Sequence, residues 1–104
     1  MNGKYGKMLK QARKIEQEMA KIEEELAQEK VEASAGGAAV KATVNGKQEL
    51  LEVKINPDVV DAEDVEMLED LVTAAVKEAL RQAKDLASQK MARLTGGLNL
   101  PGIV

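Results

Sequence analysis

Residues 40–55 read VKATVNGKQELLEVKI, and this stretch decides the fold class of the chain. Apolar and polar side chains alternate over residues 40–44, which is the period of a β-strand with one buried face. Asn45 and Gly46 tolerate the positive backbone φ angles of a two-residue turn, so a second strand should return antiparallel to the first. The pattern therefore predicts a β-hairpin.

A two-residue turn would fix the register of this hairpin. It sets Val44 opposite Lys47 and Val40 opposite Leu51. Six apolar residues then share one face of the sheet: Val40, Ala42, Val44, Leu51, Val53 and Ile55. A shorter strand over residues 31–33 would complete a three-stranded antiparallel meander, whose open edges a second subunit could cover.

The segment before the hairpin predicts a long helix. Its apolar residues follow one another at alternating spacings of three and four, as do the a and d positions of a heptad repeat. The seam consists of Tyr5, Met8, Ala12, Ile15, Met19, Ile22 and Leu26. Pairing two copies of this helix would set glutamate against glutamate, so we expect its main partner to be a different helix.

A second long helix is predicted after a break at residues 56–58. Asp61 is the expected N-cap, and the acidic residues after it complement the positive end of the helix dipole. We expect the helix to run to about Leu94 and to stop at Gly96 and Gly97. Its early half carries a broad apolar face that can cover the sheet, whereas its narrower late half can contact only another helix.

The predicted fold class is α+β, in the order helix, three strands, helix. At 1.5 Å per residue the helices would be about 38 and 50 Å long, and a compact globule of this size is only about 33 Å across, so both must protrude. We expect one domain over residues 1–95 and a flexible, glycine-containing tail over residues 96–104. The chain of 104 residues has Tyr5 as its only aromatic residue. Its core should therefore be poor in bulk, and oligomerisation, at least to a dimer, should complete the burial.

The composition argues against an enzyme. The chain has neither Cys nor His, so it lacks thiolate chemistry, disulfides and the commonest general base and metal ligand. A carboxylate pair such as Asp61 and Asp64 can bind Mg²⁺, but these residues stand where the start of a helix needs capping groups. We predict no catalytic residues, no metal and no cofactor. The chain also shows no signal peptide and no stretch of about 20 apolar residues, so a cytoplasmic location without membrane association is expected.

The charge is unevenly distributed, although the total is only −3. All five charged residues in the segment 4–14 are basic, whereas residues 16–29 carry six glutamates against a single lysine. If the two helices pack antiparallel along the seam, the early end of the first lies beside the late end of the second. One free tip would then gather the basic residues Lys4, Lys7, Lys10, Arg13, Lys14, Arg81, Lys84, Lys90 and Arg93.

A basic tip of this kind favours double-stranded DNA as the partner, because duplex phosphates form a repeating array of negative charge. In the first helix the basic residues lie away from the seam, so burial does not explain them. The near absence of aromatic residues removes the stacking platforms used on single strands and RNA loops. Gln11, Gln82 and Gln89 are weak candidates for reading base sequence. Two other interpretations stay open: the charges form an ordinary solvated surface, or the arms and tail bind a client as a protein-interaction adaptor.

Four segments resemble the YbaB/EbfC family of bacterial nucleoid-associated proteins: KMLKQARKIEQEMAKIEEELA, VKATVNG, NPDVVDAEDVEMLEDLVTAAVKEAL and LTGGLNLPG. The resemblance covers nearly the whole chain. It implies a tweezer-shaped homodimer that binds duplex DNA through its helical arms with little sequence specificity, a nucleoid location, and a role in nucleoid organisation or gene expression. The DNA contacts would fall on the nine basic residues named above. Members of the second-helix group could instead pair with Glu16 or Glu18 or complement the end of their own helix.

Overall fold

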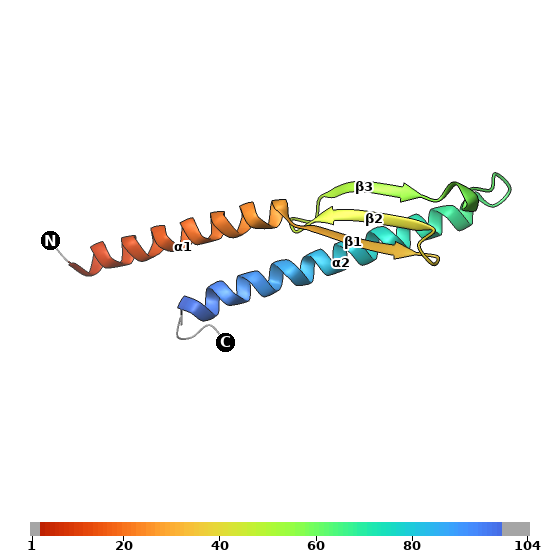
Figure 1. Cartoon of the computed structure of the whole chain (residues 1–104). Coiled ribbons are helices and arrows are strands. Elements are labelled where there is room, and N and C mark those ends of the chain that lie inside the picture. Colours follow the sequence, from red (N-terminus) through yellow and green to blue (C-terminus); the bar gives the residue numbers. More distant parts are fainter. Residues whose placement is uncertain (1–2, 99–104) are drawn as a thin grey trace.

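The computed structural model describes the backbone of residues 3–98 and the side chains of residues 5–94. Its elements are α1 (Gly3–Gln28), β1 (Lys30–Ala35), β2 (Val40–Asn45), β3 (Leu50–Ile55), a short 3-10 helix η1 (Pro57–Val59) and α2 (Val65–Leu98) (Figure 1). The three strands form one antiparallel sheet in the order β1-β2-β3. The predicted α+β class and element order are therefore confirmed, with β1 longer at both ends than expected.

The predicted hairpin register was wrong. Val40 pairs with Ile55 and not with Leu51, while Val44 pairs with Leu50 across a bulge. Val53 pairs with Ala42 and Ile55 pairs with Val40, so both still lie on the same face of the sheet as these residues of β2. The position expected for Leu51 is taken by Leu50.

The physical reason for the shifted register is that Asn45 and Gly46 serve the end of α1. The Asn45 side-chain oxygen accepts hydrogen bonds from the backbone N–H groups of Lys47 and Glu49, both at 3.0 Å. Its amide donates to the Ala27 carbonyl at 3.4 Å, and the Gly46 N–H donates to the Leu26 carbonyl at 2.8 Å. The positive φ angle in this loop belongs to Gln48, at 64°. The loop is consequently longer than two residues and cradles the C-terminus of α1.

The core lies between one face of the sheet and the early half of α2 (Figure 1). Its buried residues are small: Ala33, Val40, Ala42 and Val44 from the sheet, and Ala75, Ala79 and Ala83 from α2. Val40 and Val44 are the largest fully buried side chains, which confirms the prediction of a core poor in bulk. Alanines spaced by four residues form a smooth strip along α2, and this strip lets the helix backbone approach the sheet closely.

Both predicted ends of α2 need correction. The helix begins at Val65, and the Asp64 carboxylate accepts the Met67 N–H at 3.2 Å as its cap. Asp61 instead accepts the Glu63 N–H at 2.9 Å and closes the preceding turn. At the other end the helix continues through Gly96 and Gly97, since glycine in a helix costs only about 1 kcal/mol relative to alanine and does not forbid the next turn.

The molecule is a rod, with principal extents of 75 × 24 × 16 Å. Its radius of gyration is 20.3 Å, against about 13 Å for a compact chain of this length. α1 and the late half of α2 project beyond the same end of the sheet, and the N-terminus of α1 reaches farthest (Figure 1). The predicted protrusion of both helices is therefore confirmed. Residues 99–104 of the predicted tail lie outside the described residues. Within the described part of the chain, no helix combines the length and apolarity that crossing a membrane requires.

Candidate nucleic-acid interface

The N-terminal half of α1 presents an exposed strip of positive charge. Lys7, Lys10, Arg13 and Lys14, here called the basic ridge, are all exposed. At 3.6 residues per turn they fall within an arc of about 120° on the side of α1 away from the heptad seam. Among the side chains of residues 5–94, none of these four forms an ion pair, so their full charge faces solvent. Lys4 lies in the first turns of α1, and its side chain is outside the described residues.

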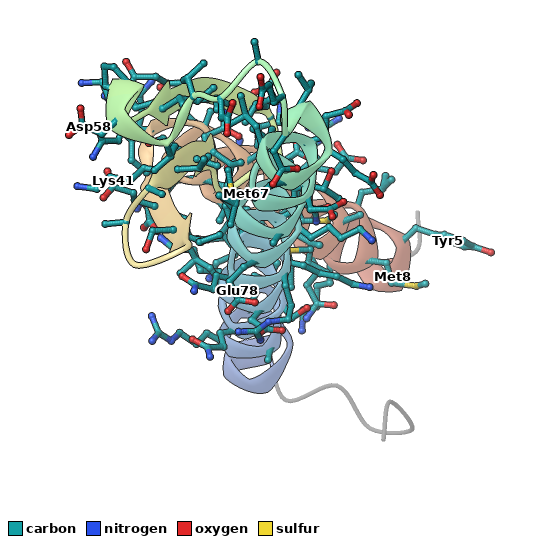
Figure 2. All side chains as sticks on the ribbon, turned by 90° about the vertical axis from the view of Figure 1, so that its right-hand side faces the viewer. Tyr5, Met8, Lys41, Asp58, Met67 and Glu78 are labelled. Carbon is teal, nitrogen blue, oxygen red and sulfur yellow. The ribbon has the colours of Figure 1, made fainter. Side chains whose placement is uncertain are left out.

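The seam side of the same half-helix is exposed as well. Tyr5 is 67% exposed, Met8 63% and Leu9 59%. Tyr5 and Met8 point away from the rest of the molecule (Figure 2). Sequence reasoning expected the whole seam to pack on the second helix, and the structure shows such burial only toward the C-terminal end of α1, where Leu26 is buried. The arm therefore has one basic side and one apolar side.

Arg81, predicted to contact DNA, is held by its own helix. Its guanidinium donates to Glu78 at 2.6 and 2.9 Å and to Asp85 at 2.9 Å. These hydrogen bonds from Arg81, with a further one from Gln82, lower the pKa of the Glu78 carboxyl to about 2. The same hydrogen bonds and the charge of Glu78 raise the pKa of Arg81. The two neighbouring carboxylates offset the positive charge of Arg81.

Lys90, also predicted to contact DNA, bridges the two helices. Its ammonium lies 2.6 Å from a Glu29 carboxylate oxygen and 3.4 Å from one of Glu25. The Lys90 side chain is only 16% exposed. Hydrogen bonding to Glu29 is the main cause that raises the pKa of Lys90. This lysine therefore joins α2 to the C-terminal end of α1 and does not extend from the arms.

These ion pairs reveal a stagger that separates the two predicted basic groups. With Lys90 level with Glu25, Lys10 lies about 22 Å farther along α1 and Lys84 about 9 Å in the opposite direction, at 1.5 Å per residue. The described end of α2 at Leu98 lies only about 12 Å beyond the bridge, by the same helical rise. The expectation of one tip built from both groups is therefore wrong: the basic ridge extends alone, Lys90 lies beside the C-terminal end of α1, and Lys84 lies past that end, level with the sheet. Lys84 and Arg93 are exposed, without an ion pair among residues 5–94.

Sequence reasoning missed an exposed apolar surface along β3 and the segment that leads into α2. Its exposed members are Leu50, Leu51, Ile55, Val60, Val65 and Met67, here called the apolar end patch. α2 covers β1 and β2, while β3 at the sheet edge has only one residue, Val53, that is partly buried. The alternation in β3 indicated an apolar face, but only the position of α2 shows that this face is left open.

The described residues hold no cluster of three or more His, Cys, Asp or Glu side chains that could bind a metal ion. Asp61 and Asp64, the carboxylate pair considered from the sequence, close a turn and cap α2.

An elongated α+β chain with an exposed basic helical arm has the features expected of a protein that binds an extended polyanion. The chain belongs to the YbaB/EbfC DNA-binding family, whose model matches residues 1–98. The resemblance seen in the sequence is thereby confirmed.

Curated relatives cover most of the chain. A nucleoid-associated protein of Thermoanaerobacter pseudethanolicus, Teth39_2199, is 56% identical over 96 residues, which span 92% of this chain and 86% of the relative. A nucleoid-associated protein of Pelotomaculum thermopropionicum is 50% identical over 103 residues, which span 99% of this chain and 98% of the relative. Among solved structures, the uncharacterized protein HP0035 from Helicobacter pylori matches with a TM-score of 0.75 at 19% identity, over 90% of this chain and 97% of that one. This last similarity concerns the fold alone.

Proposed function

We propose that this protein binds double-stranded DNA with little sequence preference, as a homodimer located on the nucleoid, and thereby affects nucleoid organisation or gene expression. The observation that carries the proposal is the basic ridge of α1, whose four cations are exposed and free of ion pairs within the described side chains. Membership in a DNA-binding family and the nucleoid-associated relatives support it.

The proposed DNA contacts are the basic ridge and Lys4 on α1, with Lys84 and Arg93 on α2. Arg81 and Lys90 are left out of this set because carboxylates of the same molecule already hold their charges. Charge neutralisation of this kind acts on any duplex, since phosphates carry no base information.

The second copy is proposed to cover the apolar end patch. β3 is an edge strand with an unpaired side, and exposed apolar residues surround it. Edges of this kind pair readily with another chain. Two copies joined there would leave their basic arms free, because the N-terminal half of α1 projects beyond the sheet (Figure 1).

A salt titration of DNA binding tests the proposal. If five to eight phosphates are neutralised, log affinity should fall against log salt with a slope of about −4 to −7 on several unrelated duplexes. The triple variant Lys7→Glu, Lys10→Glu, Lys14→Glu should weaken binding to all of these duplexes alike, because it reverses the ridge.

The matched control is Lys41→Glu, Lys47→Glu, Lys54→Glu, which changes the net charge equally on exposed residues of the sheet and its loop. It should bind far better than the ridge variant. Equal losses in the two variants would show that only net charge matters, and a flat salt response would exclude phosphate neutralisation.

A second candidate function is a protein-interaction adaptor. The apolar side of the arm, with Tyr5, Met8 and Leu9 exposed, favours it, since amphipathic helices commonly dock on partners through such a stripe. Under this hypothesis, Met8→Ser with Leu9→Ser and deletion of residues 98–104 should each abolish a partner interaction while leaving DNA affinity unchanged.

A further inference from the structure

The hydrogen bonds and ion pairs that join α1 to the other described elements lie near its C-terminal end. There the Gly46 N–H donates to the Leu26 carbonyl at 2.8 Å and to the Glu29 carbonyl at 3.2 Å. Lys90 reaches from α2 to Glu25 and Glu29 in the same turn. We call Lys90, Glu25 and Glu29 the arm latch.

A change of angle at this turn is amplified along the arm. Lys7 lies 18 residues before Glu25, about 27 Å along the helix axis, so a tilt of about 10° at the latch would move it by about 5 Å. Successive phosphates of one DNA strand are separated by only about 3.4 Å along the duplex axis. A small change of angle at this turn would therefore change which phosphates the basic ridge could reach.

The surroundings of Lys90 are unsuited to a phosphate. A cavity of about 470 Å³ borders the latch, and its lining comprises Lys21, Glu24, Glu25, Gln28, Glu29 and Lys90. Three carboxylates against two ammonium groups give this cavity a negative balance. A DNA phosphate approaching Lys90 would meet Glu25 and Glu29 first.

We propose that Lys90 is a positioning residue whose pairing with Glu25 and Glu29 sets the angle at which α1 leaves the body of the protein. The consequence for DNA rests on the function proposed above, because the fixed arm is what places the basic ridge against the duplex. The arm angle itself is a property of the free protein.

The variant Glu29→Lys separates this role from simple charge addition. It makes the protein more positive by two units, so charge counting predicts tighter DNA binding. The latch predicts the opposite, because the introduced ammonium group and that of Lys90 would repel each other and splay the arm. We expect DNA affinity to fall about three- to tenfold, in keeping with the roughly 1 kcal/mol scale of a partly exposed ion pair.

The charge swap Glu29→Lys with Lys90→Glu has the wild-type net charge and restores the shorter of the two ion pairs in reverse, although Glu25 then faces a carboxylate. It should recover part of the affinity that either single variant loses. A direct phosphate contact by Lys90 predicts no recovery, since the carboxylate that replaces its ammonium group would repel DNA. Lys41→Glu, on the sheet, is the matched control for Lys90→Glu and should change affinity less.

The arm angle can be measured without DNA. The chain has no cysteine, so Gln11→Cys and Ser88→Cys would introduce a unique pair of nitroxide labels on α1 and α2. Labelled chains diluted with unlabelled ones give the distance within one chain by electron spin resonance. Glu29→Lys should broaden and shift this distance distribution, and the swap should restore it.

Unchanged distances in Glu29→Lys would overturn the arm latch, whether or not the protein binds DNA. Failure of the wild type to bind any duplex would overturn the proposed function and leave the distance measurement valid. Tighter DNA binding by Glu29→Lys, with no rescue in the swap, would show that Lys90 acts only through its charge.

Discussion

Gly46 occupies the position where the β2–β3 loop and the end of α1 come closest. A Cβ atom added there would lie 2.7 Å from Leu26 Cδ2, 2.8 Å from the Leu26 carbonyl oxygen and 3.0 Å from Leu26 Cα. Two of these atoms belong to the helix backbone, which cannot move aside as a flexible side chain can. The absence of a side chain at this residue thus sets how α1 joins the sheet.

We predict that Gly46→Ala lowers the free energy of unfolding by about 1–3 kcal/mol, the usual cost of forcing extra atoms into a packed contact. Urea denaturation followed by circular dichroism measures this change. The control is Gly6→Ala in the exposed arm, where the added Cβ has nothing within 4 Å. That variant should not lower the denaturation midpoint; equal destabilisation of both variants would refute the close contact as the cause.

At the scale of elements, helices and strands were predictable because their signals are local. The alternation in β2, the heptad spacing in α1 and the apolar strip of α2 each need only neighbouring residues. The exposure of the basic ridge followed from the same periodicity. These features depend little on how the elements are arranged in space.

Features that depend on contacts between elements were not predictable. Asn45 and Gly46 favour a tight turn locally, yet their hydrogen bonds to α1 select a longer loop. Asp61 and Asp64 can both cap a helix, and the sequence alone cannot choose between them. The stagger of α1 against α2 is set by the sheet to which both are joined, and the sequence does not reveal it. Lys90 was therefore predicted to contact DNA.

The N-terminal half of α1 lies beyond the described end of α2, so it has no helix packed against it among residues 3–98. Isolated helices of about 12–15 residues are only marginally stable in water. We predict that amides N-terminal to Glu16 exchange with solvent far faster than those around Ala79, whose side chain is fully buried. Hydrogen–deuterium exchange read by mass spectrometry measures this gradient.

Duplex DNA should slow exchange in the N-terminal half of α1 and leave the region around Ala79 unchanged, because phosphate contacts would order the arm. The charge-reversed ridge variant provides the control and should show no slowing. Slow exchange along the whole of α1 in free protein would contradict the view that this half is held only by its own hydrogen bonds.

At the scale of the whole molecule, the arm of α1 projects beyond one end of the sheet (Figure 1), and the exposed residues of the apolar end patch lie on β3 and on the segment that leads into α2. Large exposed apolar patches are uncommon on monomers, and six large apolar side chains are exposed on β3 and the segment that leads into α2. The small alanine and valine core gives a further reason for a partner, because a chain that buries few large side chains gains stability when a second copy covers exposed ones.

We predict that Leu50→Lys with Ile55→Lys converts the protein from a dimer to a single chain of 11.2 kDa in sedimentation equilibrium. Both residues are exposed within one chain, so the fold itself should tolerate the change. The control is Met8→Lys with Leu9→Lys on the arm, which adds the same charge far from the patch and should leave the mass unchanged. A double-lysine patch variant that keeps the dimer mass would place the interface elsewhere.

Tyr5 stands near the tip of the arm, 67% exposed, in a chain without Trp or Phe. All intrinsic near-ultraviolet absorption and fluorescence therefore arises from that single ring. Emission at these wavelengths reports what happens to the arm and is silent about the sheet, whereas the far-ultraviolet signal reports the backbone as a whole. The protein thus carries a built-in optical probe near the tip of its arm.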